Sequence, residues 1–370
     1  MLDAGAIKQC FSADYFEARE KFLAAGALAG ADMARYQCPA KGTRGEDLYT
    51  DVAWLGSRDA SRALVVISGT HGVEGFCGSG FQVDWLTRCG PAAVPDGTSV
   101  LFVHAINPYG FAWLRRVTQE GVDLNRNFTD PSRPKPANPG YAEIADDLVP
   151  AQLSGPLFDA AEERLAACRK RLGDLAFFRV VAGGQYTHPD GLFFGGFEPT
   201  WSNRTTHEII RSYLQPCTDV AVVDFHTGLG PFGYGELITD YPPDSAGSRR
   251  VRDFWGDSAT EMQKGETLPF VTDGPTPYAY LRSLPDARVT VGTLEFGTYD
   301  RDNGRKALRA DHWLHRYGDP TGPEAGPINR ALRRQYFPDT LDWKESVLFR
   351  GHQVVRMALE GLQGKRAERG

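Results

Sequence analysis

Polar side chains lie at or near the ends of four apolar segments, at positions where they could do chemistry. They are His71 with Glu74, Asn107, His226 and Glu295. In an open α/β sheet, ligands bind outside the carboxyl ends of the strands, so these four segment ends would meet in one place. The sequence therefore predicts a single site that contains imidazole and carboxylate groups.

His71 and Glu74 form an HxxE pair. Residues i and i+3 lie on the same side of a helical turn, so an imidazole and a carboxylate at this spacing can converge on one cation. A catalytic zinc ion takes three protein ligands and a water molecule. His226 follows an apolar segment and precedes a glycine-containing turn, which makes it the candidate third ligand. A solvated histidine and a helix-capping glutamate are the alternative interpretation of the HxxE pair.

Glu295 lies within the otherwise apolar run 289–296. A carboxylate in such surroundings is costly unless it is paired, and its pKa should rise. Glu295 is therefore a candidate general base next to a metal-bound water. The alternative is a glutamate that points outwards from an edge strand.

A third group of charged residues is the segment Asp123-Leu-Asn125-Arg126, with Arg115 and Arg116 just upstream. The planar guanidinium group of arginine suits a carboxylate or a developing oxyanion. The segment is therefore a candidate substrate-binding loop, and a salt-bridged turn is the alternative.

The elements that must position these residues alternate between strand and helix. Continuous apolar runs predict buried strands at 63–67, 99–104, 219–225 and 288–296. Helical spacing predicts helices at 12–28 (with Ser12 as the N-cap), 76–86, 157–171, 204–214, 246–263, 328–336 and 341–362. Buried strands that alternate with helices are typical of an α/β sandwich with a mostly parallel sheet.

The motifs span most of the chain and must converge, so we expect one large domain over residues 1–370. Its motif-bearing core would cover about 45–300, with C-terminal helices at about 328–362. The proline-rich residues 129–156 predict a surface excursion that borders the site.

Composition excludes several classes of protein. The net charge is −6, without a long basic run, so a nucleic-acid partner is not expected. No uncharged apolar stretch reaches the ~18–20 residues of a membrane helix. The six cysteines form no CxxC pair, which is typical of reduced thiols, and we expect a cytoplasmic protein.

The order of these motifs resembles the zinc metallocarboxypeptidase superfamily, the carboxypeptidase A-like group that includes cytosolic carboxypeptidases and aspartoacylase-type deacylases. The resemblance spans about 64–299 and rests on HGVEG (71–75), NPYG (107–110), RVTQEGVDLNRNF (116–128), DFHTG (224–228) and LEF (294–296). It implies a three-layer α/β/α domain with a mixed, mostly parallel twisted sheet, and one Zn²⁺ per chain.

The resemblance also implies a role for each site residue. His71, Glu74 and His226 would bind zinc, and Asp123 would hydrogen-bond a ligand histidine and fix its tautomer. Glu295 would take a proton from the zinc water and protonate the leaving amine.

For the substrate, the resemblance implies that Arg116 stabilises the oxyanion, with Arg115 as the adjacent competitor. Asn125 and Arg126 would hold the terminal carboxylate of the substrate. The family also has a tyrosine between the third ligand and the base, for which Tyr278 and Tyr280 are both candidates.

We therefore expect a zinc hydrolase that cleaves an amide bond next to a free carboxylate, in a small peptide or an N-acyl amino acid. A deacylase of N-acyl amino acids on the same scaffold is the first alternative, and a non-catalytic binding module is the second. Oligomeric state stays open.

Two other motifs compete with this interpretation. Gly228, Gly230 and Gly233 match the GxGxxG dinucleotide motif, but the strand-like segment that follows opposes the helix which that motif needs. His312 and His315 are three residues apart and could bind a metal together with Asp311, but a solvated helix face is the expected interpretation.

Overall fold

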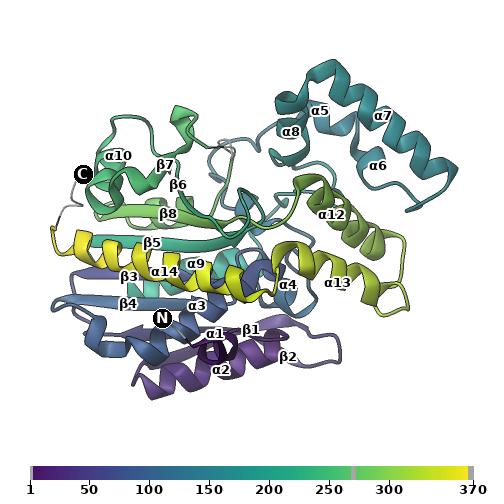
Figure 1. Cartoon of the computed structure of the whole chain (residues 1–370). Helices are drawn as coiled ribbons and strands as arrows, with labels where there is room; N and C mark the ends of the chain where they lie inside the picture. Colours follow the sequence, from purple (N-terminus) through teal and green to yellow (C-terminus); the bar gives the residue numbers. More distant parts are fainter. Residues whose placement is uncertain (1–2, 268–271, 366–370) are drawn as a thin grey trace.

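A mixed, mostly parallel β-sheet of eight strands forms the centre of the molecule (Figure 1). The computed structural model describes residues 3–267 and 272–365. The strand order is β1-β2-β4-β3-β5-β8-β6-β7, and β4, β3, β5 and β8 run parallel to one another. The strands are β1 (Asp32–Lys41), β2 (Asp47–Leu55), β3 (Arg62–Ile67), β4 (Thr98–His104), β5 (Asp219–Thr227), β6 (Gly235–Thr239), β7 (Ala259–Glu261) and β8 (Arg288–Phe296). All four predicted strands are confirmed.

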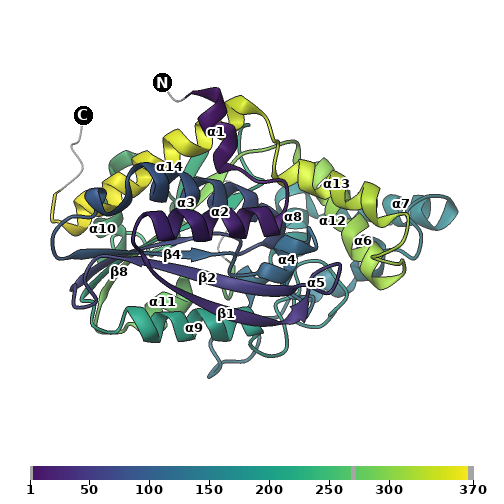
Figure 2. The ribbon, with the colours of Figure 1, turned by 90° about the horizontal axis from the view of Figure 1, so that it is seen from below.

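Helices cover both faces of the sheet, so the predicted three-layer fold is confirmed (Figure 2). One face carries α1 (Ala4–Cys10), α2 (Tyr15–Leu28), α3 (Gly75–Arg88), α10 (Ala246–Trp255) and α14 (Leu341–Leu362). The other face carries α9 (Trp201–Tyr213) and α11 (Pro277–Ser283). Within the described ranges, the molecule has no helix of the length and apolar character needed to cross a membrane.

The central strands are continuous apolar runs because both of their faces are buried. On β3, the alternate residues Leu64 and Val66 pack into the core beneath α2, α3 and α14. Ala63 and Val65 point the other way, into the core beneath α9 and α11. Successive side chains on a strand point to opposite faces, so a strand between two helical layers needs apolar residues throughout.

The remaining helices lie beyond the carboxyl ends of the central strands (Figure 1). They are α4 (Pro108–Ala112), α5 (Pro139–Ala142), α6 (Ala145–Leu148), α7 (Pro156–Leu172), α8 (Asp174–Ala182), α12 (Arg301–Arg316) and α13 (Ala325–Tyr336). Short 3₁₀ turns are η1 (Gly72–Glu74), η2 (Gly90–Ala93), η3 (Leu124–Arg126), η4 (Gly256–Ser258) and η5 (Met262–Lys264). The helices beyond the strand ends share an apolar core of their own, in which Tyr141 and Leu148 are buried. Part of the proline-rich segment is therefore internal, because its apolar residues pack against α7, α8, α12 and α13.

Some predicted boundaries are wrong. Helix α2 begins at Tyr15, because Asp14 rather than Ser12 caps it by accepting the Glu17 N–H. Helix α10 ends at Trp255, because Gly256 takes a positive φ of 59° and the chain then enters β7. Helix α8 was not predicted from the sequence.

A partly buried ion pair between α3 and α14 should make stability depend on pH. Nε2 of His352 lies 2.6 Å from Oδ2 of Asp84, which also accepts from Arg88. Burial lowers the pKa of His352, but Asp84 outweighs burial and raises the pKa to about 9. A histidine whose folded pKa exceeds its unfolded pKa of about 6.5 stabilises the fold fully below pH 6.5, and this contribution disappears as pH rises through 9.

We therefore expect the ion pair to make the wild-type protein about 1–2 kcal/mol more stable at pH 6 than at pH 9.5. The His352→Gln variant should lack this part of the pH dependence. Urea unfolding of both proteins at the two pH values measures this difference. The same pH dependence in variant and wild type would show that the ion pair does not contribute.

Candidate metal and active site

His71 and Glu74 lie in a turn that follows β3. The turn is held against the loop after α4, because the Gly72 N–H donates to the Arg116 carbonyl at 3.2 Å. A Cβ at Gly72 would lie 2.0 Å from the backbone of Gly110, so this position requires glycine. The close approach of the two backbones brings the HxxE turn and Arg116 together.

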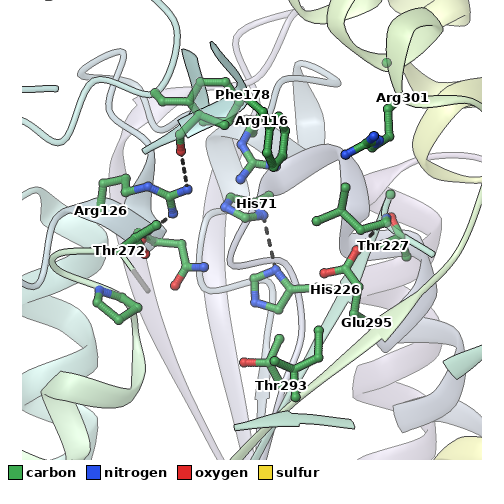
Figure 3. Close-up of a pocket in the computed structure, with 18 of the residues that line it drawn as sticks. His71, Arg116, Arg126, Phe178, His226, Thr227, Thr272, Thr293, Glu295 and Arg301 are labelled. Atoms are coloured by element: carbon green, nitrogen blue, oxygen red, sulfur yellow. Dashed lines mark hydrogen bonds between the residues drawn. The ribbon is translucent and has the colours of Figure 1, made fainter. Parts of the chain in front are cut away.

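His226 and Glu295 come from adjacent parallel strands. They are register partners in the β5–β8 pair, and both side chains are buried. The N–H of Leu229 donates to Oε1 of Glu295 at 2.9 Å. Figure 3 shows Glu295 beside His226, with His71 facing His226. The strand ends therefore meet as the sequence predicted.

The three predicted metal ligands converge. Nδ1 of His71 lies 2.9 Å from Oε1 of Glu74, and Nδ1 of His226 lies 3.3 Å from Oε2 of Glu74. The two Nδ1 atoms are 3.2 Å apart. All three side chains are buried, and their ligand atoms lie within 4.8 Å of one another. One cation could contact all three.

A carboxylate lies behind each histidine. Oδ1 of Asp123 is 3.1 Å from Nε2 of His71, and Oδ2 of Asp224 is 2.9 Å from Nε2 of His226. Such carboxylates favour a proton on Nε2 and leave Nδ1 as an acceptor, as in metal-binding histidines. Sequence reasoning included Asp123 but missed Asp224. The D-x-H spacing on one strand would have revealed it, because alternate residues share a face.

Two Nδ1 atoms and a carboxylate now face one another, which is unfavourable unless a proton or a cation lies between them. Burial alone would raise the pKa of Glu74, but the neighbouring histidines and Arg116 hold it well below its usual range. Burial lowers the pKa of His226, but Asp224 and Glu74 outweigh burial and raise it well above its usual range. Imidazole nitrogen and carboxylate oxygen are ligands that suit Zn²⁺, so the residues fit this ion.

Arg116 contacts this cluster, whereas Arg115 does not. Arg116 donates from Nη1 to Oε1 of Glu74 and from Nε to Oδ2 of Asp123, each at 3.0 Å. Arg115 instead donates to both oxygens of Asp311 at 3.1 Å. Only Arg116 of the two lines the cavity beside the cluster. The geometry favours Arg116 as the arginine near a substrate.

Asn125 and Arg126 also line the cavity. Arg126 is held by two carbonyl oxygens, those of Asn125 at 2.8 Å and Ala182 at 2.9 Å, and burial lowers its pKa. Its Nε is buried without a hydrogen-bond partner in the described part of the chain. Oδ1 of Asn125 accepts the Thr276 N–H at 2.9 Å, which leaves its amide NH₂ as a donor. The pair thus offers donors to an anionic group.

The two candidate tyrosines differ in position. Tyr278 lines the cavity from α11. Tyr280, on the same helix, is buried in the core between α11 and the sheet. Of these two candidates, Tyr278 is therefore the one that can contact a ligand in the cavity.

Glu295 has a strongly shifted acidity. Burial raises its pKa to about 8, and the negative charge of Glu74 adds to this effect. The Leu229 N–H opposes the shift. A carboxyl group with a pKa near neutrality is suited to exchange protons with a substrate.

A cavity of about 490 Å³ opens beside these residues (Figure 3). Its wall on the side of α8, α12 and α13 combines apolar side chains (Phe177, Phe178, Val181, Leu308 and Tyr336) with charged ones (Asp174, Arg301, Asp302 and Arg305). Sequence reasoning missed this wall, because apolar helix residues have the same pattern whether they face a core or a ligand. Asn107 does not line the cavity; it caps α4 by accepting the Gly110 N–H at 2.9 Å.

The competing motifs do not form sites. Gly228, Gly230 and Gly233 lead into strand β6 and not into a helix, as expected for a chance GxGxxG match. On α12, His312 is buried and not solvated, and burial lowers its pKa to about 4.

Comparisons with known proteins place the chain in a family. A search of curated protein sequences found no match. Similar solved structures include carboxypeptidase A from Helicoverpa armigera (11% identity, 86% of this chain and 73% of that chain, TM-score 0.47) and bovine thrombin-activatable fibrinolysis inhibitor (10%, 93% and 99%, 0.46). Murein-tripeptide amidase MpaA from Escherichia coli O157 is also similar (18%, 78% and 95%, 0.36). A family model described as Protein of unknown function (DUF2817) matches residues 11–350, and the chain therefore belongs to that family.

Proposed function

We propose that the protein is a zinc-dependent hydrolase that cleaves an amide bond next to a free carboxylate. One observation carries the proposal: Nδ1 of His71, Nδ1 of His226 and the carboxylate of Glu74 converge beside Glu295, with a carboxylate behind each histidine. Three ligands and an adjacent base are the protein groups that a hydrolytic zinc site needs.

Each residue of the site has a chemical task in this reaction. A zinc ion held by these three ligands would supply Lewis acidity and lower the pKa of a water molecule. Glu295 would accept a proton from that water and transfer it to the leaving amine. Arg116 places a positive charge where the carbonyl oxygen of the substrate becomes negative.

The substrate carboxylate would bind Arg126 and Asn125. The buried guanidinium of Arg126 lines the cavity and carries a positive charge, and a carboxylate is the natural partner of such a group. Binding there fixes the scissile amide relative to Glu295. A small peptide or an N-acyl amino acid has the required carboxylate.

A deacylase of N-acyl amino acids is the second candidate, and the apolar side chains within the cavity wall favour it. Phe177, Phe178 and Leu308 provide a surface for an acyl chain on the side of the site formed by α8 and α12. The ammonium group of a dipeptide would lie on the same side, where the carboxylates of Asp174 and Asp302 also line the cavity.

Matched substrates would separate the two reactions. Zinc-loaded protein is incubated with dipeptides and with N-acyl amino acids of increasing chain length, and free amino acids are measured by mass spectrometry. We expect hydrolysis that a chelator stops and that fails with carboxamide analogues. A protein that binds zinc but hydrolyses neither series would be a binding module and not an enzyme.

Asp224 provides a test of the metal site that does not depend on activity. We expect Asp224→Asn to weaken zinc binding by about 10- to 100-fold, because the carboxylate no longer orients His226. Asp219→Asn is the matched control, since Asp219 begins the same strand and pairs with Arg288 at the opposite end. Competition with a chromogenic chelator measures both affinities, and equal affinities would exclude a role of Asp224 in metal binding.

A further inference from the structure

The cavity continues past Glu295 along the sheet surface. Thr293 and Val291 line it from β8, two and four residues before Glu295 and therefore on the same face. Ile238 on β6 is the register partner of Thr293 and also lines it. Asp240 lies two residues after Ile238 and also lines the cavity, so these four residues form one wall of it. A strand rises about 3.3 Å per residue, so Val291 lies roughly 13 Å from Glu295 along β8.

Asp240 is the charged group of an otherwise neutral wall. Its carboxylate accepts one hydrogen bond, from Nε2 of Gln263 at 3.0 Å. No lysine, arginine or histidine of residues 3–267 and 272–365 forms an ion pair with it. Burial raises its pKa, and Gln263 only partly offsets this effect. A half-buried carboxylate without a cation is costly, which makes it a candidate ligand-binding group.

The wall adjoins the proposed carboxylate-binding residues. Oδ1 of Asn125 accepts from both the backbone N–H and the hydroxyl of Thr276. Thr276 precedes α11, on which Tyr278 lines the same cavity. A substrate carboxylate on Asn125 and Arg126 would therefore direct the side chain of that residue along Tyr278 towards Asp240.

We propose that Asp240 determines specificity and selects substrates whose carboxylate-bearing residue has a cationic side chain, an ammonium or a guanidinium group. This inference rests on the proposed function and deepens it. The aliphatic part of such a side chain would contact Ile238 and Val291, and its charge would pair with Asp240.

The test uses substrates that share one acyl group and differ only in the amino acid. We expect kcat/KM for lysine and arginine derivatives to exceed that for the norleucine derivative by about 10- to 100-fold, the usual effect of a hydrogen-bonded charge pair. Asp240→Asn should lose this ratio, because its amide carries no charge to pair with the cation. Asp244→Asn is the matched control, because Asp244 is exposed and lies outside the cavity wall.

A binding measurement separates this inference from the proposed reaction. The affinities of Nα-acetyl-lysine and Nα-acetyl-norleucine are measured by calorimetry for wild type and for Asp240→Asn. A lysine preference in wild type that the variant loses supports the inference even when no substrate is hydrolysed. Hydrolysis of both derivatives at equal rates, or equal affinities for the two ligands, overturns the role of Asp240 and leaves the zinc hydrolase intact.

Discussion

Replacing Glu295 with glutamine is expected to lower kcat for amide hydrolysis by about 10³-fold, while zinc remains bound. Glutamine has nearly the same shape and still offers an oxygen to the Leu229 N–H, which donates to Glu295 at 2.9 Å. It cannot accept a proton, however. The substitution therefore removes the proton transfer and leaves the cavity and the metal ligands unchanged.

The charge of the site supports this expectation. Burial raises the pKa of Glu295 to about 8, with a further contribution from Glu74. A cation bound by His71, Glu74 and His226 would draw this pKa down, because it favours the carboxylate form. Glu295 would then be deprotonated before each turnover and could still return the proton to the amine.

A matched control makes the Glu295 result specific. Glu236 is the register partner of Glu295 across β6 and β8, but it does not line the cavity, and its Oε1 accepts from the Thr260 hydroxyl. Glu236→Gln should keep turnover close to wild type. Zinc content, measured by mass spectrometry of the metal, should be equal in all three proteins. Turnover by Glu295→Gln at the wild-type rate would show that another group moves the proton.

The site could be predicted from the sequence because its residues follow long apolar strands. Continuous apolar runs such as 219–225 and 288–296 predict buried strands, and the carboxyl ends of parallel strands lie on one edge of the sheet. His226 and Glu295 could therefore be expected at the same edge of the sheet. Asp224 could have been added by the same rule, because it is two residues from His226 on one strand.

The walls of the cavity could not be predicted in this way. Phe178 and Leu308 have the spacing of core residues, and only the packing of α8 and α12 beyond the sheet brings them to the ligand side. Asp240 follows an antiparallel strand, β6, whose register with β8 depends on tertiary pairing. That Asp240 forms no ion pair with residues 3–267 and 272–365 becomes evident only in the folded structure. The convergence of the proposed metal ligands thus follows from the ends of parallel strands, whereas the composition of the cavity wall depends on how distant segments pack.

His226→Ala is expected to abolish zinc binding, with an effect larger than the about 10- to 100-fold that outer carboxylates contribute. The variant loses one of three ligand atoms, and the remaining His71 and Glu74 cannot complete a tetrahedral site. Activity should disappear together with the metal. Added zinc should raise the melting temperature of wild type, since a ligand that binds only the folded state stabilises it, and should not raise that of the variant.

Loss of a buried histidine also destabilises the fold, so the control variant must lose a buried histidine as well. His104 on β4 is as deeply buried as His226, stacks on Phe22 and bonds to Ser79 at 3.0 Å, but it lies outside the cavity. His104→Ala should lose about 2–5 kcal/mol of stability through the space it leaves, yet still bind zinc and gain stability from it. Equal zinc affinity in the His226→Ala and His104→Ala proteins would mean that the three converging donor atoms do not form the metal site.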